Sequence, residues 1–329
     1  MKLMPYTVLA ASALLIQTAF AAPTQELVFG FTALSVKSEA EIKNEIAQWQ
    51  PMLDAMSKQL KVKVTGVGST KAGDLVERMK KGEVHVALMG NVPALDALVQ
   101  ANAQVFGQVI KIKGGDSYQS LIIAHKDSKL TNLEQMLASN KQYSLQLGDV
   151  KSTSSTLVPL YYAFSRYRVT PEEVFKKVTR GNHKLNFLAV ANKEVDVATV
   201  ASDLLEGDYK EENAAEYAKV KVIWRSDPLK NDPLLYRKDL PADMKQAVEK
   251  FFLGYGKAPE EKATLKEARG LTGFKKSTNA QLQQVADIEL FQAQQSLMQD
   301  EKLTMEEKNK KHEEVSRKFA DLQRYLLTK

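Results

Sequence analysis

The sequence predicts an α/β protein built from two lobes that are joined by crossing strands. Short strand-like runs alternate with amphipathic helical runs, and the turns between them are short. The strand pattern breaks at Gly114-Gly115 and resumes a few residues later, which places a crossing between lobes there. A chain of this length, after loss of a predicted leader, keeps about 300 residues, enough for two hydrophobic cores.

The first 21 residues have the pattern of a secretory signal peptide. Lys2 supplies a short basic region, residues 6–16 are mostly apolar, and Ala19-Phe20-Ala21 is a small-x-small cleavage site. The apolar run is too short to span a bilayer comfortably, and no later run is long and apolar enough to do so. We therefore expect an exported protein that is cleaved after Ala21.

The composition excludes several classes of protein. The chain contains no cysteine, so an exported form has no disulfide, no thiolate nucleophile and no lipid-modified N-terminal cysteine. A free periplasmic protein fits this composition and a lipoprotein does not. The formal net charge is +6, and the basic residues are dispersed among acidic ones. Dispersed charge is typical of a solvated surface, so no nucleic-acid partner is expected.

Hydrophobic periodicity predicts the elements in chain order. Strands are predicted at apolar or alternating runs, at residues 26–31, 61–67, 84–88, 104–112, 120–124, 143–147, 177–179, 195–199 and 220–224. Helices are predicted at 38–56, 72–80, 94–100, 131–139, after the hydroxyl-rich run at 152–156, from Thr170, and at 186–192. After Pro241 the pattern is almost wholly helical.

Capping patterns fix several of the helix starts. Ser38-x-x-Glu41 and Thr304-x-x-Glu307 are capping boxes, and Thr170-Pro171-Glu172-Glu173 adds a first-turn proline to the same pattern. The last helix carries apolar residues in a 4-3-4 spacing, which is typical of a narrow seam that packs on another helix. These residues are Val315, Phe319, Leu322 and Leu326.

The predicted organisation has four parts after the signal peptide at 1–21. Lobe 1 begins at 22–118, lobe 2 occupies 119–224, lobe 1 is completed by 225–275, and C-terminal helices occupy 276–329. Two α/β lobes joined by crossing strands indicate a hinged binding protein that holds a ligand between its lobes.

The run Lys151-Ser152-Thr153-Ser154-Ser155-Thr156 is the first candidate for a binding site. Hydroxyl residues before an apolar helical pattern predict a helix N-terminus. Unpaired N–H groups and the helix dipole favour an anion there, and the hydroxyls add donors suited to a tetrahedral oxyanion. The alternative interpretation is an ordinary helix cap with surplus hydroxyls.

Pro159 makes the start of this helix ambiguous. A cap at Ser155 or Thr156 would place the proline where little hydrogen bonding is lost. A cap at Ser152 predicts a kinked helix instead.

Three further polar residues follow predicted strands, where open α/β sheets bind ligands. His183 could donate to an anion, or it could be a surface loop histidine. Asp203 and Asp232 could together hold a cation such as an amine on the ligand, or each could be a turn or cap aspartate. An anion site beside two carboxylates would fit a zwitterion.

Other chemistries have little support. A hydrolase triad could be drawn from Ser152 or Ser154 with His183 and Asp203 or Asp232, but no G-x-S-x-G elbow is present. The histidines are scattered and no H-E-x-x-H motif exists, so neither a metal nor another cofactor is expected. The run from Gly66 to Lys71 lacks the spacing of a nucleotide phosphate loop.

Together these stretches resemble the periplasmic phosphonate-binding proteins of bacterial ABC phosphonate importers. The resemblance covers nearly the whole mature chain. It is carried by Phe29-Gly30, Gln48-Trp49-Gln50-Pro51, and residues 101–108, 148–162, 188–199, 222–224 and 255–263.

The resemblance implies a type II periplasmic binding fold that closes on its ligand and catalyses no reaction. It implies that the phosphonate head is held by a tyrosine before the interdomain strand, a Ser-Thr-Ser helix start and a loop histidine, matched here by Tyr118, Ser152, Thr153, Ser154 and His183. In the aminoethylphosphonate-binding member, two carboxylates take the ligand ammonium. Asp203 stands where that member has a glutamate, and Asp232 matches its aspartate.

Two positions depart from the family pattern. Lys71 aligns with a family tyrosine near the anion, and Met89-Gly90-Asn91 replaces Tyr-Gly-Asn. Lys71 would bring a full charge to the cleft if it pointed inward, which affects the expected substituent rather than the family. The C-terminal helices resemble a dimerising segment, so a homodimer is expected.

The resulting expectation is a periplasmic solute-binding protein of an ABC importer. It would capture 2-aminoethylphosphonate or a related organophosphonate and deliver it to an inner-membrane permease. The alternative within the same fold is a phosphate or phosphite receptor, which would have no use for Asp203 and Asp232.

Overall fold

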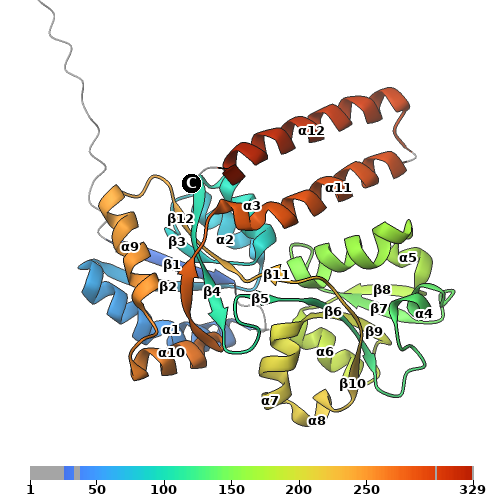
Figure 1. Cartoon of the computed structure of the whole chain (residues 1–329), viewed down its shortest axis with the longest axis horizontal. Helices are drawn as coiled ribbons and strands as arrows, with labels where there is room; N and C mark the ends of the chain where they lie inside the picture. The colour runs from blue at the N-terminus through green and yellow to red at the C-terminus, as the bar shows by residue number, and fades with distance from the viewer. Residues whose placement is uncertain (1–25, 33–37, 301, 328–329) are drawn as a thin grey trace, which may run out of the picture.

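The computed structural model describes residues 26–32, 38–300 and 302–327. Two α/β lobes lie side by side, and two long C-terminal helices run along them (Figure 1). The signal peptide predicted at 1–21 lies outside these residues. Among the described helices, none combines the length and the hydropathy that crossing a bilayer requires.

Lobe 1 is built on a six-stranded sheet with the order β13-β4-β12-β3-β1-β2. Its strands are β1 (Glu26–Thr32), β2 (Lys63–Ser69), β3 (Val86–Leu88), β4 (Ala103–Lys111), β12 (Pro233–Arg237) and β13 (Leu271–Lys276). β1 is parallel to β2 and β3, whereas β12 and β13 are antiparallel to their neighbours. The helices of this lobe are α1 (Glu39–Leu60), α2 (Ala72–Lys80), α3 (Asn91–Gln100), α9 (Ala242–Gly254) and α10 (Pro259–Arg269).

An aromatic cluster forms the core between this sheet and its helices. Phe29 of β1 contacts Trp49 of α1 edge-on, with ring centroids 5.7 Å apart, and Phe252 of α9 at the same distance. All three side chains are fully buried. Aromatic pairs of this kind contribute about 0.5–1.5 kcal/mol each beyond the area they bury.

Lobe 2 is built on a five-stranded sheet with the order β10-β6-β9-β7-β8. Its strands are β6 (Ser120–His125), β7 (Ser144–Leu147), β8 (Lys177–Arg180), β9 (Val197–Ala201) and β10 (Val220–Arg225). Its helical segments are α4 (Leu133–Leu137), η1 (Thr153–Leu157), η2 (Leu160–Phe164), η3 (Ser165–Tyr167), α5 (Pro171–Val174), α6 (His183–Ala191), η4 (Leu204–Tyr209), α7 (Lys210–Glu212) and α8 (Ala214–Tyr217).

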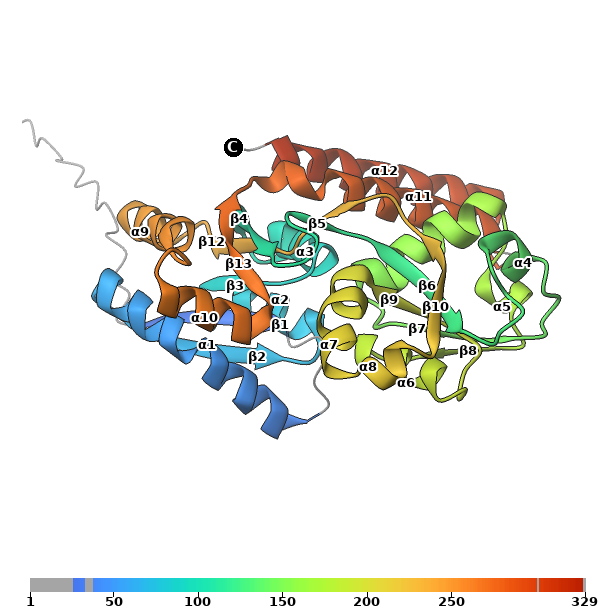
Figure 2. The ribbon, with the colours of Figure 1, turned by 60° about the horizontal axis from the view of Figure 1, so that its bottom comes forward.

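Two short antiparallel strands connect the lobes, β5 (Ser117–Tyr118) and β11 (Leu229–Lys230). The chain enters the sheet of lobe 2 just after β5 and leaves it just before β11. Figure 2 shows both connections between the lobes. A cavity between the lobes lies beside this crossing, because Tyr118 of β5 lines it.

The C-terminal segment consists of η5 (Asn279–Leu282), α11 (Gln283–Gln299) and α12 (Met305–Leu327). The Asn279 side chain fixes its base, because Oδ1 accepts from Val105 N at 2.8 Å and Nδ2 donates to Tyr325 O at 2.8 Å. Farther along α11, Gln292 Nε2 donates to Leu157 O of lobe 2 at 3.2 Å. The hairpin of α11 and α12 therefore contacts both lobes (Figure 2).

The predicted seam on α12 is confirmed in its C-terminal half. Leu326 is buried, and Phe319 and Leu322 pack against the same core cluster as the inner face of α11. The predicted capping boxes at Thr170 and Thr304 are also present.

Three local predictions were wrong. The almost wholly helical pattern predicted after Pro241 misses β13, which adds an edge strand beside β4 once Gly270 ends α10 in a left-handed conformation. The helix expected from Thr131 is capped by Asn132, whose side chain accepts from Gln135 N at 2.9 Å. The helix expected at 186–192 begins at His183, because Asn182 caps it.

Candidate functional site: a cavity between the lobes

The hydroxyl-rich run forms the start of a distorted helix, and Ser152 is its cap. Ser152 Oγ accepts from Ser155 N at 3.2 Å. The first turn is a π-turn, with Leu157 N donating to Ser152 O at 3.0 Å. The cap at Ser152 thus places Pro159 inside the helix, and the chain accommodates it with widened turns on both sides. Such π-turns occur frequently at functional sites.

The widened turn exposes carbonyl groups that the sheet of lobe 2 then binds. Ser120 Oγ of β6 donates to Ser154 O at 2.5 Å, and Thr199 Oγ1 of β9 donates to Ser155 O at 2.7 Å. Gly148 N also donates to Ser155 O at 2.9 Å. These bonds anchor the helix start rigidly on lobe 2 and orient its hydroxyl face toward lobe 1.

This helix start lines a cavity of about 80 Å³ between the lobes. Nearly all of the predicted site residues line the cavity: Tyr118, Ser152, Thr153, Ser154, His183, Asp203 and Asp232. Lys71 does not line it. Lys71 is exposed at the cap of α2, and its neighbour Thr70 lines the cavity instead.

Thr153 links the two lobes at the cavity. Its Oγ1 accepts from Val92 N, in the first turn of α3, at 3.1 Å. The N-terminal ends of η1 and α3 therefore face the same space from opposite lobes. Both ends present backbone N–H groups and the positive end of a helix dipole, which favour an anion between them.

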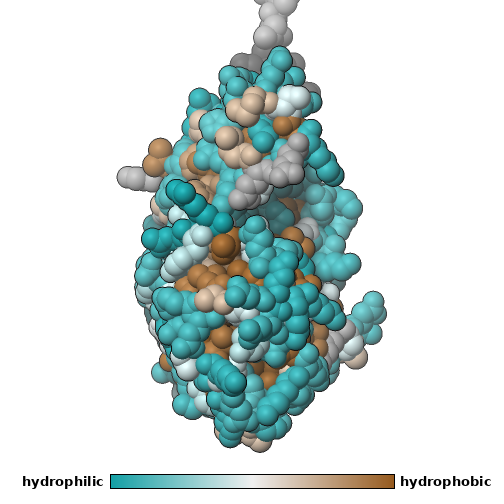
Figure 3. Space-filling model, turned by 90° about the vertical axis from the view of Figure 1, so that its right-hand side faces the viewer, coloured by the Kyte–Doolittle hydropathy of each residue, from teal (hydrophilic) through white to brown (hydrophobic). Residues whose placement is uncertain are grey.

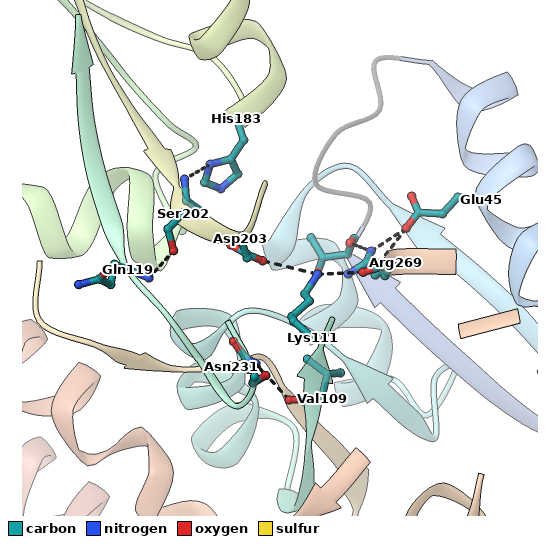
Figure 4. A network of polar contacts seen from close by, with 12 residues as sticks. Glu45, Val109, Lys111, Gln119, His183, Ser202, Asp203, Asn231 and Arg269 are labelled. Atoms are coloured by element: carbon teal, nitrogen blue, oxygen red, sulfur yellow. Dashed lines mark hydrogen bonds and ion pairs between the residues drawn. The ribbon is translucent and has the colours of Figure 1, made fainter. Parts of the chain in front are cut away.

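His183 is buried and its tautomer is fixed by the backbone (Figure 4). Its Nδ1 accepts from Ala201 N at 3.2 Å, so the neutral ring carries its proton on Nε2. Burial lowers the pKa of His183 to about 4, although the charge of Asp203 acts in the opposite direction. A neutral ring at neutral pH thus has one N–H left to donate.

Tyr118 also stays protonated. Burial raises the pKa of its hydroxyl, and the charges of Asp232 and Asp203 raise it further, although hydrogen bonding to Asn91 and Ser154 opposes them. The cavity therefore holds the Tyr118 hydroxyl as a donor close to the hydroxyls of the helix start.

The two aspartates line the same cavity, one from each lobe. Asp203 follows β9, and Asp232 lies between β11 and β12. Asp203 Oδ1 is buried and has no hydrogen-bond partner among the described residues. Burial raises the pKa of Asp232, as does the charge of Asp203, while Lys111 and Arg269 oppose the shift. The cavity therefore combines several donors with one carboxylate oxygen, Asp203 Oδ1, that has no partner among the described residues.

Sequence reasoning missed Lys111, which lines the cavity from the end of β4. Its Nζ lies 3.5 Å from Asp203 Oδ2 and donates to Arg269 O at 3.1 Å (Figure 4). The signal that could have identified Lys111 is its place at a strand end, the same signal that pointed to Asp203. The strand predicted at 104–112 runs past Lys111, whereas β4 ends at Lys111.

Thr32 was also missed. It is the last residue of β1 and lines the cavity, and its Oγ1 is buried without a hydrogen-bond partner among the described residues. This hydroxyl has a proton to donate and no acceptor for it among the described residues.

A second polar contact between the lobes lies beside the helix start. Lys151 Nζ is 2.8 Å from Asp96 Oδ2 of α3. Glu289 of α11 faces the same pair. Burial raises the pKa of Glu289 to about 7, Asp96 adds to the shift, and Lys151 opposes it. The ligand-binding helix start, α3 and the C-terminal hairpin thus meet at one charged cluster.

The geometry suits binding better than catalysis. His183 Nδ1 is occupied by a backbone N–H, and Ser152 Oγ accepts from Ser155 Oγ at 2.6 Å. Within the described residues, no group of three or more His, Cys, Asp or Glu side chains is placed to hold a metal ion.

Comparison with known proteins gives a consistent result. A family model described as "ABC transporter, phosphonate, periplasmic substrate-binding protein" matches residues 31–282, which include every residue that lines the cavity. The phosphonates-binding periplasmic protein of Escherichia coli K12 is 36% identical over 304 residues, covering 92% of this chain and 88% of that protein. A Mycolicibacterium smegmatis protein named phosphate-import protein PhnD is 25% identical and covers 59% of this chain and 61% of its own length.

Solved structures agree in fold. A binding protein component of an ABC phosphonate transporter from Pseudomonas aeruginosa matches with a TM-score of 0.78 and 33% identity, covering 91% of this chain and 97% of that one. PhnD1 from Prochlorococcus marinus, solved with methylphosphonate, matches with a TM-score of 0.68, covering 80% of this chain and 97% of that one; at 17% identity it shows the fold alone.

The predicted fold class is confirmed: two α/β lobes joined by crossing strands, with C-terminal helices, as in type II periplasmic binding proteins. The family binds substrate for a transporter and is not a family of enzymes, as expected from the sequence. With the family model matching most of its length, this chain belongs to the periplasmic substrate-binding proteins of ABC phosphonate transporters.

Proposed function

We propose that the phosphonate captured by this protein is a zwitterion, 2-aminoethylphosphonate or a related aminoalkylphosphonate. The observation that carries the proposal is Asp203 Oδ1, a buried carboxylate oxygen of a residue that lines the cavity, which no group in the described ranges satisfies. Leaving a charged acceptor unsatisfied costs about 1–3 kcal/mol or more, so the site is poised for a donor that the ligand supplies.

The phosphonate head would be held at the helix start. The Ser152, Thr153 and Ser154 hydroxyls and their backbone N–H groups would donate to its oxygens. Tyr118 and His183 Nε2 would complete the set of donors. Hydrogen bonds to an ionised group in a closed, water-poor cavity are roughly twice as strong as neutral ones, which favours a doubly charged head over neutral competitors.

The ligand ammonium would lie between Asp203 and Asp232. These two carboxylates come from opposite lobes, so an ammonium that contacts both would favour the closed arrangement. Closure about the β5 and β11 crossing, at the predicted lobe boundaries near 118 and 224, is the change that a permease would detect.

The rival within the fold is a phosphate or phosphite receptor. The Mycolicibacterium smegmatis relative is named as a phosphate-import protein, which is the observation that favours this alternative. A simple oxyanion such as hydrogen phosphate, however, offers at most a P–OH proton to Asp203 Oδ1; it carries no cation to balance Asp203 and Asp232, and both carboxylates would repel it.

Calorimetric titration with 2-aminoethylphosphonate, ethylphosphonate, phosphite and phosphate separates these functions. We expect aminoethylphosphonate to bind tightest, by about tenfold or more over ethylphosphonate, because only it offers an ammonium to the carboxylates. Equal affinity for the two would remove the ammonium role of Asp203 and Asp232. Preference for phosphate would establish the simple-anion receptor instead.

The hydrolase alternative predicts turnover. Hydrolysis of a panel of phosphoesters or acyl esters by the purified protein, lost in Ser152→Ala, would contradict a function limited to binding. We expect no turnover, because neither Ser152 nor His183 has the partner that a nucleophile and base require.

We also propose that residues 1–21 direct the protein to the periplasm.

A further part of the proposal concerns assembly. We propose that the C-terminal helices form a homodimer. Exposed apolar side chains on the helical hairpin support an interface: Phe291, Met298 and Met305. Figure 3 shows brown, apolar atoms gathered in the middle of this end of the molecule, among mostly hydrophilic ones. Light scattering during gel filtration would give the mass of a dimer, and Phe291→Glu would yield a monomer.

A further inference from the structure

We propose that Lys111 sets the charge of the substituent site, so that the cleft selects phosphonates whose substituent carries one positive charge. This inference rests on the proposed use of Asp203 and Asp232 for the ligand ammonium. Lys111 would act as a specificity-determining residue, since its own ammonium neutralises one of the two carboxylates before the ligand arrives.

The position of Lys111 is fixed from two sides. Its Nζ lies 3.5 Å from Asp203 Oδ2 in lobe 2 and donates to Arg269 O in lobe 1 at 3.1 Å. The side chain is only 15% exposed. Lys111 therefore pairs with one oxygen of Asp203 and leaves the other, Oδ1, buried and without a partner in the part of the chain that the structure describes.

Lys111 also lies where two cavities meet, the cavity between the lobes (the inner cavity) and a larger outer cavity. It lines the inner cavity and an outer cavity of about 340 Å³, bounded by α1, η4 and the end of α10. Asp203 and Asp232 line both cavities as well. A substituent that extends from the phosphonate head toward the outer cavity must therefore pass these three charges.

The charges of the substituent site, which consists of Asp203, Asp232 and Lys111, sum to a single negative charge. Arg269 and Glu45, which also border this region, cancel each other in a buried ion pair with 2.7 Å between Nη2 and Oε1. With both aspartates ionised, Lys111 leaves a net charge of −1. One ligand ammonium would neutralise that charge, whereas a neutral or anionic substituent would leave it unbalanced.

Without Lys111 the two carboxylates would compete for a proton. Two carboxylates that share a water-poor site cannot both ionise easily, and one pKa rises. Lys111 opposes this effect, because its charge lowers the pKa of Asp232 against burial. Of the other groups facing the pair, Tyr118 from β5, His183 from α6 and Asp208 from η4 are neutral or acidic. Arg269 also lowers the pKa of Asp232, but it is held in an ion pair with Glu45.

The test compares Lys111→Met with the wild type by calorimetry between about pH 5.5 and 8.5. For each ligand, the association constant of the variant is divided by that of the wild type at the same pH, so that the ligand's own ionisation cancels. For 2-aminoethylphosphonate we expect this ratio to rise with pH, by up to about tenfold per unit, because binding must displace the extra proton. For ethylphosphonate the ratio should not change with pH.

Two variants serve as controls. Lys111→Arg keeps the charge and should give a ratio that does not vary with pH for either ligand. Lys113→Met removes the same charge two residues away, where Lys113 is 45% exposed and pairs with Glu211 outside the inner cavity. It should also give a ratio that does not vary with pH.

Specific outcomes would overturn the inference. A ratio for aminoethylphosphonate that does not vary with pH would show that Lys111 does not control the ionisation of the aspartates. Equally weakened binding of both ligands at every pH, or loss of binding of both, would show that Lys111 only connects the two lobes structurally. Failure of the proposed function would appear separately, as wild-type protein that binds ethylphosphonate and aminoethylphosphonate equally.

Discussion

Individual side chains in this cleft have their protons placed before a ligand binds. The Ala201 N–H group holds His183 in the tautomer that donates through Nε2, and burial keeps the ring neutral. Asp203 is placed to accept rather than to donate. Its Oδ2 pairs with Lys111, and its Oδ1 has no hydrogen-bond partner among the described residues. Such preorganisation reduces the ordering cost that binding must overcome.

The His183 pKa predicts a stability change in acid. The pKa falls from its ordinary 6.5 to about 4 on folding, so the unfolded chain binds a proton first as pH decreases. The contribution of the neutral ring to the free energy of unfolding is complete above pH 6.5 and is lost as pH falls toward 4. Urea denaturation across this range should show a shallower pH dependence for His183→Gln. An unchanged slope would mean that the ring titrates normally.

Removing the His183 donor should weaken the head site for every ligand. We expect His183→Ala to weaken binding of both aminoethylphosphonate and ethylphosphonate by about 10- to 100-fold, the value of a hydrogen bond to a charged group. Calorimetry measures both constants. A loss confined to aminoethylphosphonate would contradict a role at the phosphonate head.

Asp203→Asn should have the opposite selectivity. The amide keeps the size of the side chain but removes the charge that faces the ligand ammonium. We expect binding of aminoethylphosphonate to weaken by about 10-fold or more, with ethylphosphonate bound as well as before or better. Equal loss for both ligands in this titration would indicate a structural role for Asp203.

Among the elements, the distorted helix start at 153–157 positions the head site. Its π-turn frees the carbonyls of Ser154 and Ser155, and strands β6 and β9 bind them. The hydroxyl-rich composition predicted a helix start here, and the structure confirms it. The choice of Ser152 as cap was open in the sequence, because it depends on the hydroxyls of Ser120 and Thr199 that lie far away in the chain.

Substitution of Gly148 would test how tightly the helix start at 153–157 packs on lobe 2. A Cβ at Gly148 would lie 1.7 Å from Ser155 Oγ, so no side chain fits there. We expect Gly148→Ala to lower the free energy of unfolding by about 1–3 kcal/mol, as overpacking does. Gly73→Ala is the matched control, because a Cβ there meets nothing within 4 Å and alanine favours the helix. Similar stability for the two variants would argue against tight docking at Gly148.

At the scale of the whole molecule, the C-terminal hairpin connects the lobes that must move. Gln292 of α11 contacts the helix start, Asn279 fixes the base of the hairpin to lobe 1, and Glu289 faces the interlobe pair of Lys151 and Asp96. Any opening of the cleft must therefore change contacts of this hairpin.

Glu289 gives this contact a pH dependence of opposite sign to that of His183. Its pKa rises from 4.5 to about 7 on folding, so its contribution to stability is complete below pH 4.5 and is lost as pH rises through 7. Glu289→Gln, which resembles the protonated acid, should be more stable than the wild type at about pH 8 and equally stable near pH 4. Denaturation curves at both pH values would measure this, and a variant less stable at pH 8 would show that the charged form is favoured.

The sequence by itself determined the two-lobed fold, most strands and helices, and seven of the residues that line the cavity. These features depend on local patterns: periodicity, capping boxes, a run of hydroxyls, and polar residues just after strands. Only the tertiary structure showed that Lys111 and Thr32 line the same cavity and that β13 completes the sheet of lobe 1. Those features depend on partners distant in the chain. Lys111, for example, pairs with Asp203 of the opposite lobe, which no local pattern around Lys111 predicts.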